Sequence, residues 1–199
     1  MKHIRPAIVM IGVMTVITGI IYPLTMTGIA QSMFPYQANG SLVRKDGKVV
    51  GSALIGQDFA SDRYFHGRPS ATTEPDPKDP TKTVPAPYAA DNSAGSNLGP
   101  TSRALVDRVK QDAAKLAADN PSTPIPADLV TASASGLDPD ITPAGALFQV
   151  RRVARARGLP EDKLRQLVNR HESGRFLGII GEPHVNVLQL NLALDAMKG

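Results

Sequence analysis

Residues 7–30 read AIVMIGVMTVITGIIYPLTMTGIA, a run of 24 positions without a charged side chain. Ile, Val, Leu and Met fill 13 of these positions. As a helix the run would extend roughly 36 Å, against a hydrocarbon core of about 30 Å in a typical bilayer. The pattern therefore predicts a transmembrane helix over residues 7–30, with a kink near its outer end where Pro23 removes a backbone hydrogen bond.

A cleaved secretory signal is the other interpretation of this run, because Gly28 and Ala30 put small residues where a signal peptidase would cut. A signal core typically spans only about 7 to 15 apolar residues, and this run is much longer. We therefore expect the segment to remain as a membrane anchor.

Basic residues near the helix predict its orientation. Lys2 and Arg5 lie close to one end, whereas the next basic residue on the other side is Arg44. Because Lys and Arg gather on the cytoplasmic side of membrane helices, residues 1–6 are expected in the cytoplasm and residues 31–199 outside it. In a bacterium with two membranes this places the large domain in the periplasm and the helix in the inner membrane.

Small side chains gather on one face of the predicted helix. Gly12, Thr15 and Gly19 follow each other at helical spacings, and such a face lets a second transmembrane helix approach closely. Glycine and threonine are also common in membrane helices without such a role. Both interpretations stay open, and the first makes these residues candidates for a subunit interface.

The remainder of the 199-residue chain leaves roughly 155 to 165 residues for one compact domain with a single core. The chain has no cysteine, which excludes a disulfide scaffold, a thiol nucleophile and thiolate zinc sites. The net charge of +4 includes two basic residues that precede the helix. The nearly balanced remainder does not indicate a nucleic-acid partner.

The chain outside the membrane is expected to form a single α+β domain with a small sheet or hairpin and about four helices. Asp46-Gly47 between apolar runs predicts a hairpin over residues 40–50. Helices are predicted over 102–118 and from Thr142 as N-cap to Gly158, with further helices starting near Glu161 and Val187. The segment 74–90 contains five prolines, so it is expected to be an extended surface loop that tolerates shortening.

No catalytic or metal-binding constellation is recognisable in the sequence. The glycines at 95 and 99 lack the lysine of a phosphate-binding loop, so a tight turn is the better interpretation. Ser133 and Ser135 have no nearby histidine in sequence, which makes a membrane-anchored serine hydrolase a weak alternative. The four histidines show no metal-ligand spacing. We predict no catalytic residue and no metal ligand.

Two groups of residues suggest contacts with other molecules. Tyr64 and Phe65 beside Arg68 are typical of interface anchors, although the same residue types also fill protein cores. Three arginines at 151, 152 and 155 share one flank of a predicted helix. For these the preferred interpretation is a solvated helix face rather than a docking surface for an acidic partner.

Five motifs, in this order along the chain, resemble those of the KdpC family, the C subunit of the bacterial Kdp potassium-transporting ATPases. They span most of the chain after the membrane helix, and only the proline-rich stretch 74–87 looks like an insertion. The motifs are GSALIGQDF at 51–59, YFHGRPSA at 64–71, GSNLGP at 95–100, PADLVTASASGLDP at 126–139 and GEPHVNVLQLNLAL at 181–194.

The resemblance implies an inner-membrane assembly with a channel-like potassium-binding subunit, an ATP-hydrolysing P-type subunit and a very small stabilising subunit. The chain lacks the Asp-Lys-Thr-Gly phosphorylation motif, so the catalytic aspartate would belong to another subunit. The family role is that of a catalytic chaperone that raises the affinity of the ATP-hydrolysing subunit for ATP. ATP and potassium would be handled by the complex, and no cofactor is expected on this chain.

A domain outside the cytoplasm would not meet cytoplasmic ATP, so we expect any effect on ATP affinity to be indirect. An independent membrane-anchored sensor or binding module remains the alternative. Expected contact residues are Gln57, Phe59, Tyr64, Phe65 and Arg68. Loop candidates are Ser96, Asn97, Thr131, Ser133, Ser135, Gly136 and Asp138.

Overall fold

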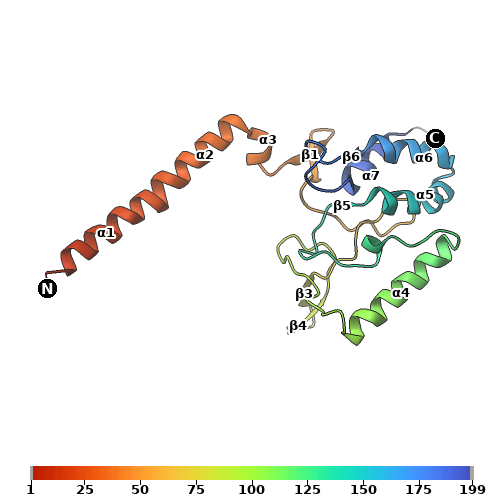
Figure 1. Cartoon of the computed structure of the whole chain (residues 1–199), viewed down its shortest axis with the longest axis horizontal. Coiled ribbons are helices and arrows are strands. Elements are labelled where there is room, and N and C mark those ends of the chain that lie inside the picture. The colour runs from red at the N-terminus through yellow and green to blue at the C-terminus, as the bar shows by residue number, and fades with distance from the viewer. Residues whose placement is uncertain (1, 198–199) are drawn as a thin grey trace. The chain divides into compact units, whose positions relative to one another are not determined.

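The computed structural model describes residues 2–197, and the chain divides into two compact units, Met1–Ser52 and Ala53–Gly199. The first carries one long helix and a hairpin. The second, here called the body, carries the remaining sheets and helices. Figure 1 shows the elements of both units, coloured from the amino to the carboxyl terminus.

A single helix runs through Ile4–Met33 and is apolar enough to cross a membrane. It consists of α1 (Ile4–Val16), a π-helical turn (Ile17–Ile21) and α2 (Tyr22–Met33). None of the residues in its most hydrophobic window, of mean hydropathy 2.2, is buried. The irregularity that the sequence predicts as a kink takes the form of this π-helical turn. Pro23 has no N–H to donate to the preceding turn, and the helix widens there.

The predicted hairpin follows the short helix α3 (Pro35–Ala38) and is confirmed. Strands β1 (Leu42–Lys45) and β2 (Lys48–Ser52) pair antiparallel. Asp46 and Gly47 both have positive φ, 51° and 77°. This is the backbone that an Asp-Gly turn supplies most easily.

The body is an α+β domain, as predicted. Its largest sheet has three short antiparallel strands in the order β5-β7-β6. The strands are β5 (Asp140–Ile141), β6 (Glu172–Ser173) and β7 (His184–Asn186). The helices are α4 (Arg103–Asp119), α5 (Pro143–Arg157), α6 (Glu161–Arg170) and α7 (Val187–Ala196).

Capping residues set the helix boundaries where the sequence predicts them. The Thr142 hydroxyl accepts a hydrogen bond from the Gly145 amide at 2.9 Å, and Pro143 occupies the first helical position of α5. Gly158 ends α5 with φ of 67°. The side chain of Asn186 caps α7 by accepting from the Gln189 amide at 3.1 Å.

The core lies between α5, α6 and α7. Their apolar faces bury Val150, Val153, Leu164, Leu190 and Leu194 completely. Helix α4, described over its whole length, buries no residue. Its half-buried Leu116 packs against the core.

The segment 74–90 departs from the prediction of an extended loop. Strands β3 (Thr73–Asp76) and β4 (Asp79–Pro85) form a two-stranded hairpin. Each strand of such a pair has one unpaired edge, where a proline loses no ladder hydrogen bond. Proline content alone therefore did not exclude strands here.

Candidate functional site

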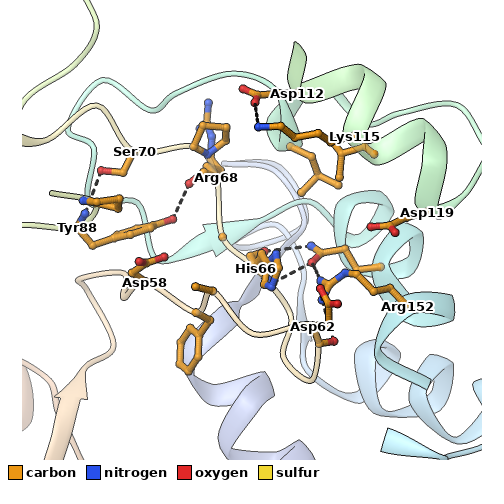
Figure 2. Close-up of a pocket in the computed structure, with 18 residues that line it drawn as sticks. Asp58, Asp62, His66, Arg68, Ser70, Tyr88, Asp112, Lys115, Asp119 and Arg152 are labelled. Carbon is orange, nitrogen blue, oxygen red and sulfur yellow. Dashed lines mark hydrogen bonds and ion pairs between the residues drawn. The ribbon is translucent and has the colours of Figure 1, made fainter. Parts of the chain in front are cut away.

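The body has a half-open cleft of about 460 Å³, here called the central cleft (Figure 2). The segment 58–70 forms its floor, and Tyr88 stands at one end. Arg152 of α5 stands at the other end, and α4 contributes Asp112 and Lys115. Three elements far apart in sequence thus meet around the motif that the sequence analysis singled out at 64–71.

Gln149 holds the cleft floor against α5. Its side chain, 3% exposed, accepts from the His66 amide at 2.8 Å and donates to the His66 carbonyl at 3.0 Å. Its carbonyl oxygen also accepts from Arg152 at 2.7 Å. The side-chain amide of Gln149 therefore pairs with the backbone of His66 as a neighbouring strand would. This pairing holds the segment 58–70 against α5.

Arg152 continues this arrangement. Its guanidinium donates to the backbone carbonyls of Asp62 at 2.8 Å and Tyr64 at 3.0 Å. The residue is only 6% exposed, and burial lowers its pKa although the nearby carboxylates of Asp62 and Asp119 oppose this. The prediction of a solvated arginine was wrong for Arg152, because three acceptors replace its water.

The imidazole of His66 lies in the cleft between these groups. Burial lowers its pKa, and the positive charge of Arg152 lowers it further. Its Nε2 lies 3.0 Å from the Ser61 carbonyl oxygen, so this nitrogen carries the proton in the neutral ring. His66 is therefore a neutral donor near pH 7 and is placed to brace the loop at 61–66.

Tyr88 closes the opposite end of the cleft. Its hydroxyl donates to the Arg68 carbonyl at 2.7 Å and its amide donates to the Ser70 hydroxyl at 3.0 Å. The ring fills the space above Gly56 and Gly67, where a Cβ at either position would overlap it. Burial raises the pKa of Tyr88 to about 12, with a further contribution from the charge of Asp138.

Arg68 connects two of the predicted motifs. Its guanidinium forms an ion pair with Asp138 at 2.9 Å and makes longer hydrogen bonds, both 3.4 Å, to the carbonyls of Thr131 and Ala132. Both partners of the ion pair stay about one quarter exposed, at 26% and 29%. The structure thus brings the segment 64–71 and the segment 131–138 together at one surface.

The loop at 93–97 joins the same region. The Ala94 amide donates to the Ser135 carbonyl at 2.9 Å. The hydroxyls of Ser133 and Ser135 accept from the backbone amides of Gly136 and Leu137. These are turn-forming roles, and they favour a structural function over the hydrolase alternative. Ser96 is half-buried beside them, whereas Asn97 is exposed.

Of the predicted contact residues, Phe65 is corrected by the structure. It is 0% exposed and lies in the core, where Asn191 holds its backbone, so it offers no contact surface. Tyr64 is half-buried, and its ring lies 5.5 Å from that of Phe59 and 4.7 Å from the Arg157 guanidinium. Adjacent aromatics in one motif therefore divide between the core and the surface.

The remaining candidates lie in two places. Gln57 is half-buried at the start of the segment that leads into the cleft. The small residues Gly12, Thr15 and Gly19 are exposed on the helix of the first unit. Apart from the adjacent residues and the backbone of the same helical turns, no atom lies within 4 Å of the point where a Cβ at Gly12 or Gly19 would stand. The face they form is therefore open within the described residues.

Tyr88, Gln149 and the buried state of Arg152 were not predicted from the sequence. Gln149 and Arg152 lie one helical turn apart on α5, and a polar pair inside an otherwise apolar stripe was the available signal. Tyr88 gave no local signal, since the two glycines it covers are more than 20 residues away.

Charges of both signs line the central cleft. Within residues 2–197 no three His, Asp or Glu side chains are grouped so that they could hold a metal ion. The cleft is suited to a polar segment or side chain that carries its own hydrogen-bonding groups. The charged residues are Asp58, Asp62, Asp112 and Asp119 with Arg68, Lys115 and Arg152.

Comparison with known proteins covers nearly the full chain. Residues 4–196 match the family model described as KdpC, the c chain of K⁺-transporting ATPase. Potassium-transporting ATPase KdpC subunits are similar over almost their entire length. That of Rhodopseudomonas palustris strain BisB18 is 66% identical over 198 residues, with all of both chains covered. Those of Bradyrhizobium diazoefficiens and Methylobacterium nodulans are 66% and 63% identical, with at least 97% of each chain covered.

Proposed function

The chain belongs to the KdpC family of K⁺-transporting ATPase subunits, and on this basis we propose that it is a membrane-anchored accessory subunit that stabilises the assembly. The match over residues 4–196 carries the proposal, because it includes both the apolar helix and the body. The partners would be a channel-like potassium-binding subunit, an ATP-hydrolysing P-type subunit and a very small stabilising subunit. An independent sensor module fits this membership poorly.

The helix would anchor the subunit in the inner membrane with its amino terminus in the cytoplasm. The body would then lie in the periplasm and cover or brace the ion-entry face of the channel-like subunit. The exposure of the whole Ile4–Met33 helix supports an anchor, because a buried core helix would be covered by its own chain. The near-terminal Lys2 and Arg5 support the orientation.

An effect on ATP affinity would be indirect in this arrangement. If the subunit binds the ATP-competent conformation of the assembly more tightly, it must shift the equilibrium toward that conformation. The ion pair of Arg68 and Asp138, together with Tyr64, is the proposed contact region of the body. Buried side chains of α5 hydrogen-bond the backbone at residues 64–66. The contact region is therefore rigidly connected to α5, and binding of a partner there would act on the body as a whole.

Co-purification tests the assembly role. The tagged chain in mild detergent should retain polytopic subunits and potassium-stimulated ATP hydrolysis. Substituting Arg68 and Asp138 together by Ala should weaken retention, whereas substituting Lys82 and Asp79, an exposed ion pair of the β3–β4 hairpin, should not. Purification of the unsubstituted chain by itself would contradict the assembly role.

Protease accessibility tests the orientation. In sealed spheroplasts the body should be cut by external protease while the amino terminus stays protected. Protection of the body would place it in the cytoplasm and remove the reason for indirect coupling.

A further inference from the structure

The body exposes a concentrated apolar turn at Phe176–Ile180, here called the apolar knob. Within the described residues the body leaves seven large hydrophobic side chains exposed, and four of them lie in these five positions. Phe176, Leu177, Ile179 and Ile180 are 68%, 77%, 79% and 63% exposed. Single exposed apolar residues are ordinary, but a cluster of this density indicates a binding surface.

Backbone hydrogen bonds hold the knob in one conformation. The Phe176 amide donates to the Ile180 carbonyl at 2.8 Å, and the Ile180 amide donates back at 3.0 Å. The Gly178 amide donates to the Arg175 carbonyl at 3.0 Å. Outside the turn, Arg175 and Glu182 form an ion pair at 2.6 Å. The side chains are therefore presented before any partner arrives, which reduces the ordering cost of binding.

Leu177 is unfavourable in this position for two separate reasons. Its φ is 53°, a left-handed backbone that costs a leucine more than a glycine or an asparagine. Its side chain also stands in water. An asparagine would relieve both costs, so the choice of leucine points to a contact that the isolated chain does not make.

We infer that the apolar knob docks into an apolar pocket on the extramembrane surface of an integral-membrane partner subunit. The inference rests on the proposed function. Family membership supplies such a partner, because the similar proteins are subunits of a K⁺-transporting ATPase, and the apolar helix would tether the body to the membrane that holds them.

The charges around the knob favour a protein over a lipid surface. Segments that bind anionic bilayers carry clustered Lys and Arg, often with Trp at the interface. Residues 174–182 contain one Arg and one Glu, which neutralise each other in the ion pair, and no Lys or Trp. A neutral knob of fixed shape is complementary to a preformed neutral pocket.

The double variant Leu177→Asn with Ile179→Asn tests the docking. Asn tolerates positive φ, so the melting temperature of the full chain in detergent should stay the same or rise. Retention of the chain by a tagged polytopic subunit should fall by about tenfold or more, as expected for a central apolar anchor. Leu54→Asn, at a site 63% exposed elsewhere in the body, is the matched control and should leave retention unchanged.

The outcomes separate this inference from the proposed function. If the unsubstituted chain retains its partners and the double variant retains them equally, the docking inference is overturned and the accessory role stands. If the unsubstituted chain brings down no polytopic subunit, both are overturned. Lower retention with a lowered melting temperature would be a folding defect and would also count against the docking inference.

A second measurement decides between protein and lipid. The chain has no cysteine, so Ile179→Cys places a single environment-sensitive fluorophore on the knob. In nanodiscs of phosphatidylethanolamine and phosphatidylglycerol the full chain alone should show water-exposed emission, and the assembled complex should show a blue shift. A blue shift in the chain alone would assign the knob to the bilayer and overturn the inference.

Discussion

Helix Ile4–Met33 leaves its isoleucines between 45% and 67% exposed, whereas α5 in the body buries Val150 and Val153 completely. Burial of apolar area contributes roughly 25 cal/mol per Å². The body gains that free energy from its own residues. The first helix does not, and it needs a membrane or partner helices to gain it. The difference explains why one chain holds both a self-contained domain and a segment that is stable only in other surroundings.

Polar groups follow the same division. In the body, Asn191 is 1% exposed and satisfies both the amide and the carbonyl of Phe65 at 2.9 Å. The Thr18 hydroxyl of the first helix bonds only within its own helix, to the Met14 carbonyl at 2.7 Å. The apolar knob is the exception in the body, since its side chains are exposed like those of the helix. That exception is why we assign it a partner.

The largest change in the free energy of unfolding is expected from a substitution in the core. Phe65→Ala should lower the free energy of unfolding of the body by about 3 to 5 kcal/mol, because it leaves a cavity around a fully buried ring. Chemical denaturation followed by circular dichroism measures this change. Phe176→Ala makes the same substitution at a 68% exposed site and should change it by no more than about 0.5 kcal/mol. Equal losses would show that burial does not distinguish the two rings.

A charge in the first helix should be nearly as costly. Ile20→Arg, near the centre of the apolar run, should disfavour membrane insertion by about 3 to 4 kcal/mol. A translocon-insertion assay of the full chain measures the inserted fraction. Leu42→Arg in the hairpin, outside the helix, serves as the control and should insert normally. Unchanged insertion of Ile20→Arg would remove the case for a lipid-facing helix.

A smaller effect is expected at the end of the central cleft. Tyr88→Phe removes the donor to the Arg68 carbonyl and should lower the free energy of unfolding by about 1 kcal/mol. Denaturant midpoints measure the loss. Tyr36→Phe removes a comparable donor to the Ser41 carbonyl in the first unit and should leave the unfolding of the body unchanged. If Tyr88→Phe leaves the free energy of unfolding unchanged, packing of the ring alone holds the residue in place.

The smallest effect is a pH dependence. The pKa of His66 is below 6.5 in the folded chain and near 6.5 in the unfolded chain. Its contribution to stability is therefore complete above pH 6.5 and is lost as pH falls toward the folded pKa, because the unfolded state binds the proton first. The melting temperature should decline from about pH 7.5 to about pH 5.5, and less so in His66→Gln. An identical decline in both proteins would assign it to other groups.

Elements with local chemistry were predictable from the sequence. The Asp46-Gly47 turn, the Thr142 cap and the Gly158 stop each depend on residues within one or two turns of chain, and all three are confirmed. Helices α6 and α7 began where Glu161 and Val187 indicated. The family resemblance was likewise confirmed over nearly the full chain.

What the sequence could not supply depends on contacts across long separations. Phe65 lies in the core, where its buried backbone is satisfied by Asn191, 126 positions later. Arg152 is buried because carbonyls near residue 62 replace its water. A strand pairing was also hidden in the proline-rich segment, since proline signals a loop locally while a two-stranded hairpin tolerates it on open edges. The contact residues of the assembly remain predictions.

The β3–β4 hairpin leaves and re-enters the body at adjacent residues, because the Ala86 amide donates to the Thr72 carbonyl at 3.0 Å. Residues 73–85, between the two bonded positions, therefore form a separate projection from the body. An epitope or a small fluorescent domain could be grafted there with Thr72, Ala86 and Tyr88 kept in place. Such a graft would give an internal handle for imaging the subunit while both termini remain native.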